Sequence, residues 1–96
     1  MRLVWANRAK AELHDLRRYS IERWGAAVAK SYLGDIRDAA KRVAATPERA
    51  RLLKGPFRIL RVRSHYLIVH VDPTSDKATI ARVLHVAMDV ERHLPS

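Results

Sequence analysis

Cysteine is absent from this 96-residue chain, so neither a disulfide nor a cysteine-based metal site can form, and the composition fits a reducing compartment. Only three glycines occur, far apart, which excludes a glycine-rich phosphate-binding loop. No apolar run approaches the roughly 20 residues of a membrane span, and residues 1–8 lack the apolar core of a signal peptide. We therefore expect a cytosolic protein with no membrane association, built as a single domain over residues 1–96.

Acidic residues are missing from one long segment. No aspartate or glutamate lies between Arg49 and Val71, whereas the whole chain has a net charge of +9 and 14 of its 19 cationic side chains are arginine. Arginine contacts carboxylates and phosphates bidentately, so the segment predicts a basic surface for phosphate, nucleic acid or an acidic polypeptide. The cationic residues that we assign to this surface are Arg51, Lys54, Arg58, Arg61 and Arg63.

The five histidines show no metal-ligand spacing, so we expect no metal, and nothing in the sequence indicates another cofactor. His70 and His85 lie in predicted strands, where a hydrogen-bonded histidine on a sheet face is the simpler interpretation, and general acid–base chemistry on RNA is the alternative. The cations that could then stabilise the phosphate are Arg58, Arg61 or Arg63, and Arg82. Because strand residues alternate, Arg61 and Arg63 share one face and Arg58 takes the other, which disfavours a single catalytic pocket.

Aromatic residues are few, at 6% of the chain. Trp5, Tyr19, Trp24 and Tyr32 are interpreted as core or helix-packing residues. A platform for stacking nucleic-acid bases would need aromatic rings beside the basic strands. Only Phe57 and Tyr66 lie there, so direct nucleic-acid binding stays an open question.

Two helices are predicted in the first half of the chain, after a short strand at Leu3–Trp5. Asn7 is the expected N-cap of the first helix, and Gly25 its terminator. The second helix begins near Ala26 and ends at Thr46, because the residue before a proline avoids the helical region. The short connection implies an antiparallel hairpin. The apolar stripes of the two helices are Ala9, Leu13, Leu16, Ser20 and Trp24, and Ala29, Leu33, Ile36, Ala40 and Val43.

Three strands are predicted in the second half: Phe57–Arg63, Tyr66–Asp72 and Lys77–Val86. The run Tyr66–Val71 is nearly all apolar, which suits a strand covered on both faces. The tail Met88–Leu94 is long enough for one helical turn. The fold class is therefore α+β, in the order β-α-α-β-β-β, with an N-terminal helical hairpin packed on a small antiparallel sheet and a short C-terminal tail.

Four segments together resemble the RelE/ParE superfamily of bacterial toxins, whose strand-to-helix start, interhelical turn, sheet entry and final strand they match in order. These segments are Trp5–Leu13 (WANRAKAEL), Trp24-Gly25 followed by Ala29 and Tyr32, Leu53–Arg58 (LKGPFR), and Arg82–Asp89 (RVLHVAMD) followed by His93-Leu94. The last of them is the most specific and resembles the ParE branch.

The resemblance implies one of two activities. RelE-like members cut messenger RNA on the ribosome, and ParE-like members are associated with poisoning DNA gyrase. RelE-like members often carry basic residues and a tyrosine or histidine after the last strand. Here Met88 and Asp89 occupy that region, and an aspartate would repel an RNA phosphate, which favours the ParE branch. His85 and His93 keep the nuclease alternative open, and a toxin fold that only binds partners is a third reading.

Both branches imply a cognate antitoxin, ParD-like in this branch, that is acidic in its toxin-binding segment, so we expect a hetero-oligomer. The excess of positive charge fits such a partner, and the basic surface defined above is where we expect it to bind. For the gyrase-inhibiting activity, which needs no catalytic residues, we expect the target to contact the last strand and tail. The target-contact residues are Arg82, His85, Met88, Asp89, Arg92 and His93.

Overall fold

The computed structural model describes residues 1–94. Its elements in chain order are β1 (Arg2–Trp5), α1 (Asn7–Trp24), α2 (Ala26–Ala45), the 3₁₀ turn η1 (Pro47–Arg49), β2 (Arg51–Lys54), β3 (Phe57–Val62), β4 (His65–Asp72), β5 (Lys77–His85) and the 3₁₀ turn η2 (Val90–His93). Every predicted helix and strand is present, and the tail forms the expected single turn. Neither helix in this part of the chain is both long and apolar enough to cross a bilayer.

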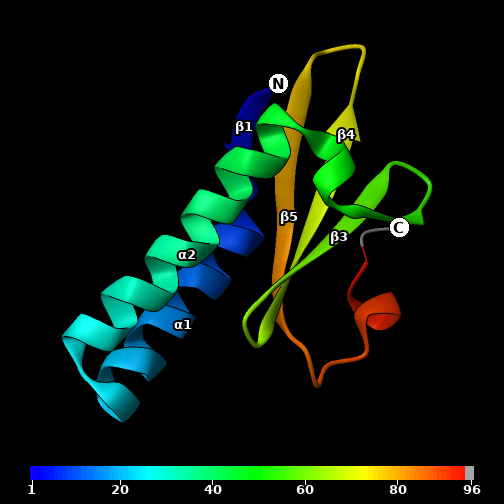
Figure 1. The fold of residues 1–96 in the computed structure, drawn as a ribbon. Coiled ribbons are helices and arrows are strands. Elements are labelled where there is room, and N and C mark those ends of the chain that lie inside the picture. Colours follow the sequence, from blue (N-terminus) through cyan, green and yellow to red (C-terminus); the bar gives the residue numbers. More distant parts are fainter. Residues whose placement is uncertain (95–96) are drawn as a thin grey trace.

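The strands form one sheet in the order β1-β5-β4-β3-β2, with the α1–α2 hairpin packed on one face (Figure 1). This confirms the predicted α+β class. Two details differ from the prediction. β1 runs parallel to β5, so the sheet is not wholly antiparallel, and β2 is an additional strand. Arg51–Lys54 is a short edge strand with a charge at each end, a pattern that blunts sheet edges and that conceals the strand in the sequence.

The hairpin turns at Gly25, as predicted. Gly25 has φ +89° and ψ 166°, a backbone conformation that residues other than glycine rarely adopt. The start of α1 differs from the prediction, because Ala6 and not Asn7 is the N-cap, and no side chain caps it. Ala6 still donates its N–H to the Ile80 carbonyl at 3.0 Å, so the last sheet-bonded residue is also the helix cap.

The main core lies between the hairpin and the sheet. The predicted α2 stripe is buried in full, whereas on α1 only Ala9 and Ser20 are fully buried and Trp24 is exposed. In β4, Leu67, Ile68 and Val69 are all 0% exposed, which confirms that both faces of this strand are covered.

A second, smaller core on the opposite face of the sheet consists of Ile59, Ile68 and Leu84. Val90 and Leu94 pack against it, so the C-terminal tail crosses that face after leaving β5 (Figure 1). The tail, as far as Leu94, is therefore held against the sheet through Val90 and Leu94.

Candidate functional site

The β3–β4 turn is held onto α2. Arg63 adopts φ +53° in this turn and donates from Nε to the Asp35 carboxylate at 2.7 Å. Its guanidinium lies 5.1 Å from the ring centroid of Tyr32. The Tyr32 hydroxyl accepts the Ser64 N–H at 3.1 Å. Arg63 therefore belongs to the turn and does not share a strand face with Arg61, contrary to the alternation that the sequence implied.

Two histidines lie beside this turn. The Tyr32 hydroxyl is 2.6 Å from Nδ1 of His65, and the rings of His65 and His85 meet edge to face at 5.2 Å. The Ala87 N–H donates to Nδ1 of His85 at 3.0 Å, so that nitrogen holds a lone pair. Burial, and then the neighbouring His85, lower the pKa of His65 below its ordinary value. The environment of His65 therefore favours its neutral imidazole.

The histidine pair forms the floor of the largest cavity described here, about 600 Å³, which we name the hairpin groove. It opens between the tip of the helical hairpin and the end of the sheet, where Figure 1 shows α1 and α2 extending past the strands. Its lining residues are Glu12, Asp15, Leu16, Tyr19, Arg23, Trp24, Tyr32, Ser64, His65, Val83, His85 and Met88.

The aromatic wall of the hairpin groove is exposed. Tyr19 and Trp24 are 54% and 51% exposed, and their rings stack edge to face at 5.7 Å. The sequence analysis interpreted both as core or helix-packing residues, and Trp24 follows the helical spacing of α1, but both lie on the last turns of that helix and are exposed. Large exposed aromatic side chains around a cavity are typical of a binding surface.

Arg82 is buried, with only 8% of its surface exposed. It donates from Nε and Nη2 to the Glu12 carboxylate of α1, at 2.7 Å for the shortest contact, and from Nη1 to the His93 carbonyl at 2.9 Å. Glu12 also accepts the Val83 N–H at 3.0 Å. Arg82 thus ties the tail and α1 to β5.

A β-bulge positions this contact. Ile68 pairs with Arg82 but Val69 pairs with Ile80, so Ala81 is the extra residue. The bulge breaks the alternation of β5, and Ile80 and Val83 both pack into the main core. β1 ends opposite Ile80, so Glu12 binds β5 just beyond the end of β1, while β4 pairs with the other side of β5.

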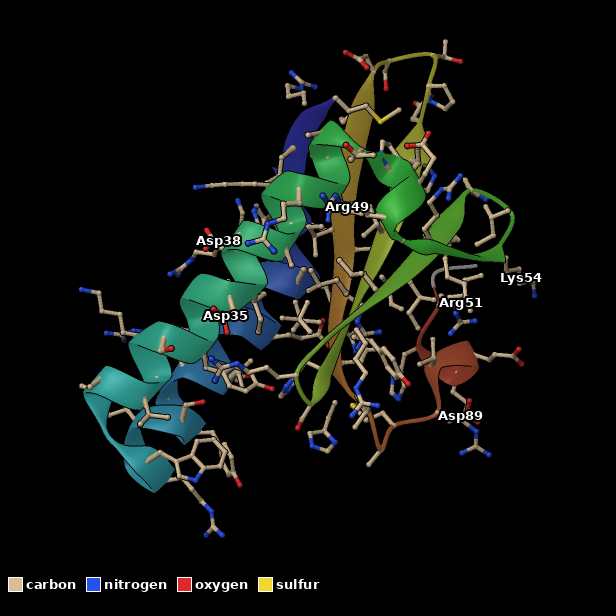
Figure 2. All side chains as sticks on the ribbon, viewed as in Figure 1. Asp35, Asp38, Arg49, Arg51, Lys54 and Asp89 are labelled. Carbon is tan, nitrogen blue, oxygen red and sulfur yellow. The ribbon has the colours of Figure 1, made fainter. Side chains whose placement is uncertain are left out.

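Five of the six predicted target-contact residues divide between two cavities, and Asp89 lines neither. His85 and Met88 line the hairpin groove, and the Met88 N–H donates to the His85 carbonyl at 2.9 Å. Arg82, Arg92 and His93 border a separate cavity of about 480 Å³ beneath the tail. Asp89 is exposed and lies 3.6 Å from Nε of Arg92, and Figure 2 shows it where the tail turns.

The predicted basic surface does not gather at one point. Arg58 donates to the Ala50 carbonyl at 3.0 Å, and Arg61 donates from Nε to the Arg63 carbonyl at 2.8 Å. Arg51 and Lys54 are exposed on β2, and Figure 2 shows Lys54 at the far end of that strand.

A third cavity, about 470 Å³, lies between α2 and the edge of β3, and we name it the arginine groove. Its lining residues are Asp35, Ala39, Arg42, Arg49, Leu60, Arg61 and Val62. The sequence analysis did not predict this site, because a single arginine on a helix, such as Arg42, has the pattern of an ordinary surface residue. Within residues 1–94, no three potential metal-binding side chains come together.

The comparisons with known proteins identify relatives along nearly the whole chain. The family model described as the ParE toxin of type II toxin–antitoxin system, parDE, matches residues 3–90. A curated relative, Toxin ParE1 of Mycobacterium tuberculosis, is 35% identical over 91 residues, which is 90% of each chain.

Solved structures share the fold. A chain of the chromosomal ParDE toxin–antitoxin system from P. aeruginosa superimposes with a TM-score of 0.77 at 19% identity, covering 90% of this chain and 96% of that one. A chain of the toxin–antitoxin complex RelBE2 from Mycobacterium tuberculosis gives 0.66 at 17% identity, with 88% and 95% covered. The fold is therefore common to ParE-named and RelE-named proteins.

Proposed function

This chain belongs to the ParE toxin family of type II toxin–antitoxin systems, and on that premise we propose that it inhibits DNA gyrase by binding, without cleaving RNA. The family fixes the toxin class, and the choice of gyrase over the ribosome rests on the residues of this chain.

The observation that carries the proposal is that the candidate phosphate-binding arginines are already hydrogen-bonded to other groups of the protein. RNA cleavage needs cations that converge on one phosphate, together with an acid and a base. The four arginines that the sequence offered for that task each make a different internal contact: Arg58 with the Ala50 carbonyl, Arg61 with the Arg63 carbonyl, Arg63 with Asp35, and Arg82 with Glu12 and the His93 carbonyl. A binding inhibitor has no such requirement.

The proposed gyrase-contact surface is the end of β5 with the tail. His85, Met88, Asp89 and Arg92 are exposed there and are available to a partner. Arg82 is buried, so we assign it the role of holding the tail in place. Met88 is 39% exposed on the rim of the hairpin groove, where an apolar side chain suits a protein contact better than a nucleic-acid phosphate.

The alternative is a ribosome-dependent endoribonuclease, and one observation favours it. His65 and His85 lie together in a cavity that also holds the Tyr32 hydroxyl. A histidine pair can act as acid and base on an RNA phosphodiester. Against this, Glu12 and Asp15 border the same cavity and would repel a phosphate.

We also propose an antitoxin partner. The similar solved structures come from toxin–antitoxin systems, and a net charge of +9 suits an acidic partner. The exposed residues of the predicted antitoxin surface, which a partner can reach, are Arg51, Lys54, Arg61 and Arg63.

The test is to incubate the purified protein with gyrase, supercoiled DNA and ATP, and to measure supercoiling and trapped cleaved DNA. We expect inhibition, and we expect Met88→Glu to weaken it more than Lys10→Glu, a control with a larger change in charge at an exposed position of α1 that lines neither the hairpin groove nor the cavity beside the tail. Messenger RNA ends on ribosomes are mapped in parallel.

Codon-positioned RNA cuts that disappear in a His85→Ala variant, with supercoiling unaffected by the unmodified protein, would replace this proposal with the nuclease. Inhibition of gyrase that is equally strong in Met88→Glu and Lys10→Glu would retain the target and refute the contact surface.

A further inference from the structure

A furrow runs between α1 and α2, on the side of α1 opposite to the hairpin groove, and we name it the helix furrow. It consists of two cavities of about 230 Å³ and 280 Å³, which adjoin because Arg17, Leu33 and Arg37 line both. Successive helix residues are about 100° apart, so the furrow residues of α1 lie roughly half a turn around that helix from those of the hairpin groove. The helix furrow is therefore separate from the proposed gyrase-contact surface.

Every ionisable side chain that lines the helix furrow is basic. Lys10, His14 and Arg17 come from α1, and Lys30 and Arg37 come from α2, whereas no aspartate or glutamate of the described chain borders either cavity. All five side chains are exposed, and none of them forms a salt bridge within residues 1–94. The positive charge of the furrow is thus available to a partner.

The acidic residues of the hairpin lie on other faces of its helices. Asp15 and Glu22 of α1 and Asp38 of α2 are roughly a third of a turn or more around their helices from the line of furrow residues. Glu12 and Asp35 lie nearly opposite that line, and each is already paired with an arginine of the sheet or its turns. Figure 2 shows Asp35 and Asp38 along α2. The hairpin therefore separates its charges by face.

The helix furrow offers a partner charge but little apolar surface. Ala29 and Leu33 are buried at its base, and none of the large hydrophobic side chains that are exposed in the described chain lines it. Protein–protein interfaces have an apolar core, whereas surfaces that bind a nucleic-acid backbone are more polar and strongly positive. The furrow therefore suits phosphates better than a protein partner.

The spacing of the cations suits a duplex. Lys30 and Arg37 are seven residues apart on one helix, which is about 10.5 Å and close to three base steps of about 3.4 Å along a DNA strand. Arg17 faces them from α1. A single strand is usually bound by stacking its bases on aromatic rings. Trp5 is the one tryptophan, tyrosine or phenylalanine that lines the furrow among the described residues, and it is half-buried against the main core.

We propose that the helix furrow binds the phosphate backbone of duplex DNA through Arg17, Lys30 and Arg37, without reading the base sequence. Cationic side chains that neutralise phosphates release condensed counterions, so the affinity falls steeply with salt concentration. The inference rests on the proposed function in one respect, that the duplex is the DNA held by the target enzyme. The hairpin then lies on the DNA while the end of β5 and the tail contact the gyrase protein.

The probe is a short fluorescent DNA duplex, and its binding to the purified protein without gyrase is measured by anisotropy across a salt series. Arg17→Glu/Arg37→Glu should weaken binding by about tenfold or more and make the slope of log K against log salt shallower by about 2, because each phosphate contact contributes about 0.9. The matched control is Arg42→Glu/Arg49→Glu, which changes the net charge equally at exposed positions of the arginine groove. If both variants lose affinity and slope equally, only the overall charge matters and the proposal is overturned.

A charge-preserving variant separates phosphate contact from folding. Arg17→Lys/Arg37→Lys should keep the salt slope and most of the affinity, since lysine also binds phosphate as a point charge. Circular dichroism and thermal unfolding establish that each variant is folded. A folded lysine variant that binds DNA as weakly as the glutamate variant would contradict the role given to these charges.

Two competitors test the choice of duplex DNA. An oligothymidine with the same number of phosphates and a polyglutamate of equal charge should each displace the duplex only at higher concentration than unlabelled duplex does. Competition by polyglutamate at the same concentration as duplex would make the furrow a general polyanion surface. Equal competition by the oligothymidine would make it a single-strand site, and either result refutes the inference.

The gyrase assay separates the two proposals. A protein that binds DNA through the furrow but leaves gyrase active contradicts the proposed function alone. A protein that inhibits gyrase, while its furrow variant binds DNA no more weakly than the matched control, contradicts this inference alone.

Discussion

Glu12 is the residue on which most separate contacts depend. Its carboxylate accepts from the buried Arg82 guanidinium and from the Val83 N–H of β5, beyond the end of β1. Arg82 in turn bonds to the His93 carbonyl of the tail. One carboxylate therefore joins α1, β5 and the C-terminal segment, and its loss would leave a buried cation and a backbone donor without their acceptor.

We expect Glu12→Ala to lower the free energy of unfolding by about 3–5 kcal/mol, the usual cost of removing one partner of a buried ion pair. Urea denaturation measures it. Asp89→Ala is the comparison, because it removes the exposed Asp89–Arg92 pair, which should contribute no more than about 1 kcal/mol. Similar urea midpoints for the two variants would refute the role given to Glu12.

His65 makes the fold sensitive to acid. Burial and the neighbouring His85 lower its pKa in the folded state below the ordinary value of 6.5. As the pH falls below about 6.5, the unfolded chain takes up a proton that folded His65 resists, so the free energy of unfolding falls. Above about pH 8 the residue is neutral in both states and contributes no pH dependence. The other charged and polar side chains that border the same cavity are Glu12, Asp15, Tyr19, Arg23, Tyr32, Ser64 and His85.

Thermal unfolding between pH 7.5 and pH 5 checks this dependence. The unmodified protein should lose stability across that range, and a His65→Gln variant should lose less. His14→Gln, at an exposed position of α1, should behave like the unmodified protein. A His65→Gln variant with an unchanged slope would show that other groups cause the acid sensitivity.

The two helices depend on one glycine and tolerate replacement of another. Gly25 joins them at φ +89°, whereas Gly34 sits inside α2 with helical backbone and open space where a Cβ would point. The same substitution at the two positions therefore has opposite expected signs.

Gly25→Ala should destabilise the protein by about 1–3 kcal/mol, because the backbone of an alanine is strained at this φ and ψ. Gly34→Ala should stabilise it by about 0.5–1 kcal/mol, because alanine loses less conformational entropy in a helix. Chemical denaturation of both variants and the unmodified protein under the same conditions measures the two changes in the free energy of unfolding. Loss of stability at Gly34, or none at Gly25, would contradict the backbone argument.

The whole molecule carries a net charge of +9, and every helix and strand except β4 contains a lysine or an arginine. Such a field accelerates the encounter with an acidic partner, and salt screens it over about 10 Å at 0.1 M. The affinity of the complex depends on desolvated apolar anchors, which salt affects far less.

We therefore expect the association rate with the antitoxin to fall by about tenfold or more between low and high salt, with the dissociation rate changing little. Stopped-flow measurements across a salt series determine both rates. An association rate that is indifferent to salt would place the partner away from the cationic surface.

The sequence by itself determined the elements and the layers. The α2 stripe, the Gly25 break and the apolar run of β4 are local patterns, and each is set by the period of a helix or a strand. The strand β2 was not predictable in this way, because a four-residue edge strand with charged ends has no period to read. The motifs near Trp5, Trp24 and Arg82 were sufficient to indicate the superfamily, since they match it in order.

Only the tertiary structure decided which side chains meet. Glu12 and Arg82 lie 70 residues apart in the chain, and the bulge at Ala81 sets the register that brings them together. Arg63 left the strand pattern because its turn requires a positive φ, and Tyr19 and Trp24 became exposed because the hairpin extends past the sheet. A sequence pattern predicts which face of its own helix or strand a side chain occupies. Its contacts with side chains of other elements depend on how those elements are aligned, and that alignment is fixed only when the core has packed.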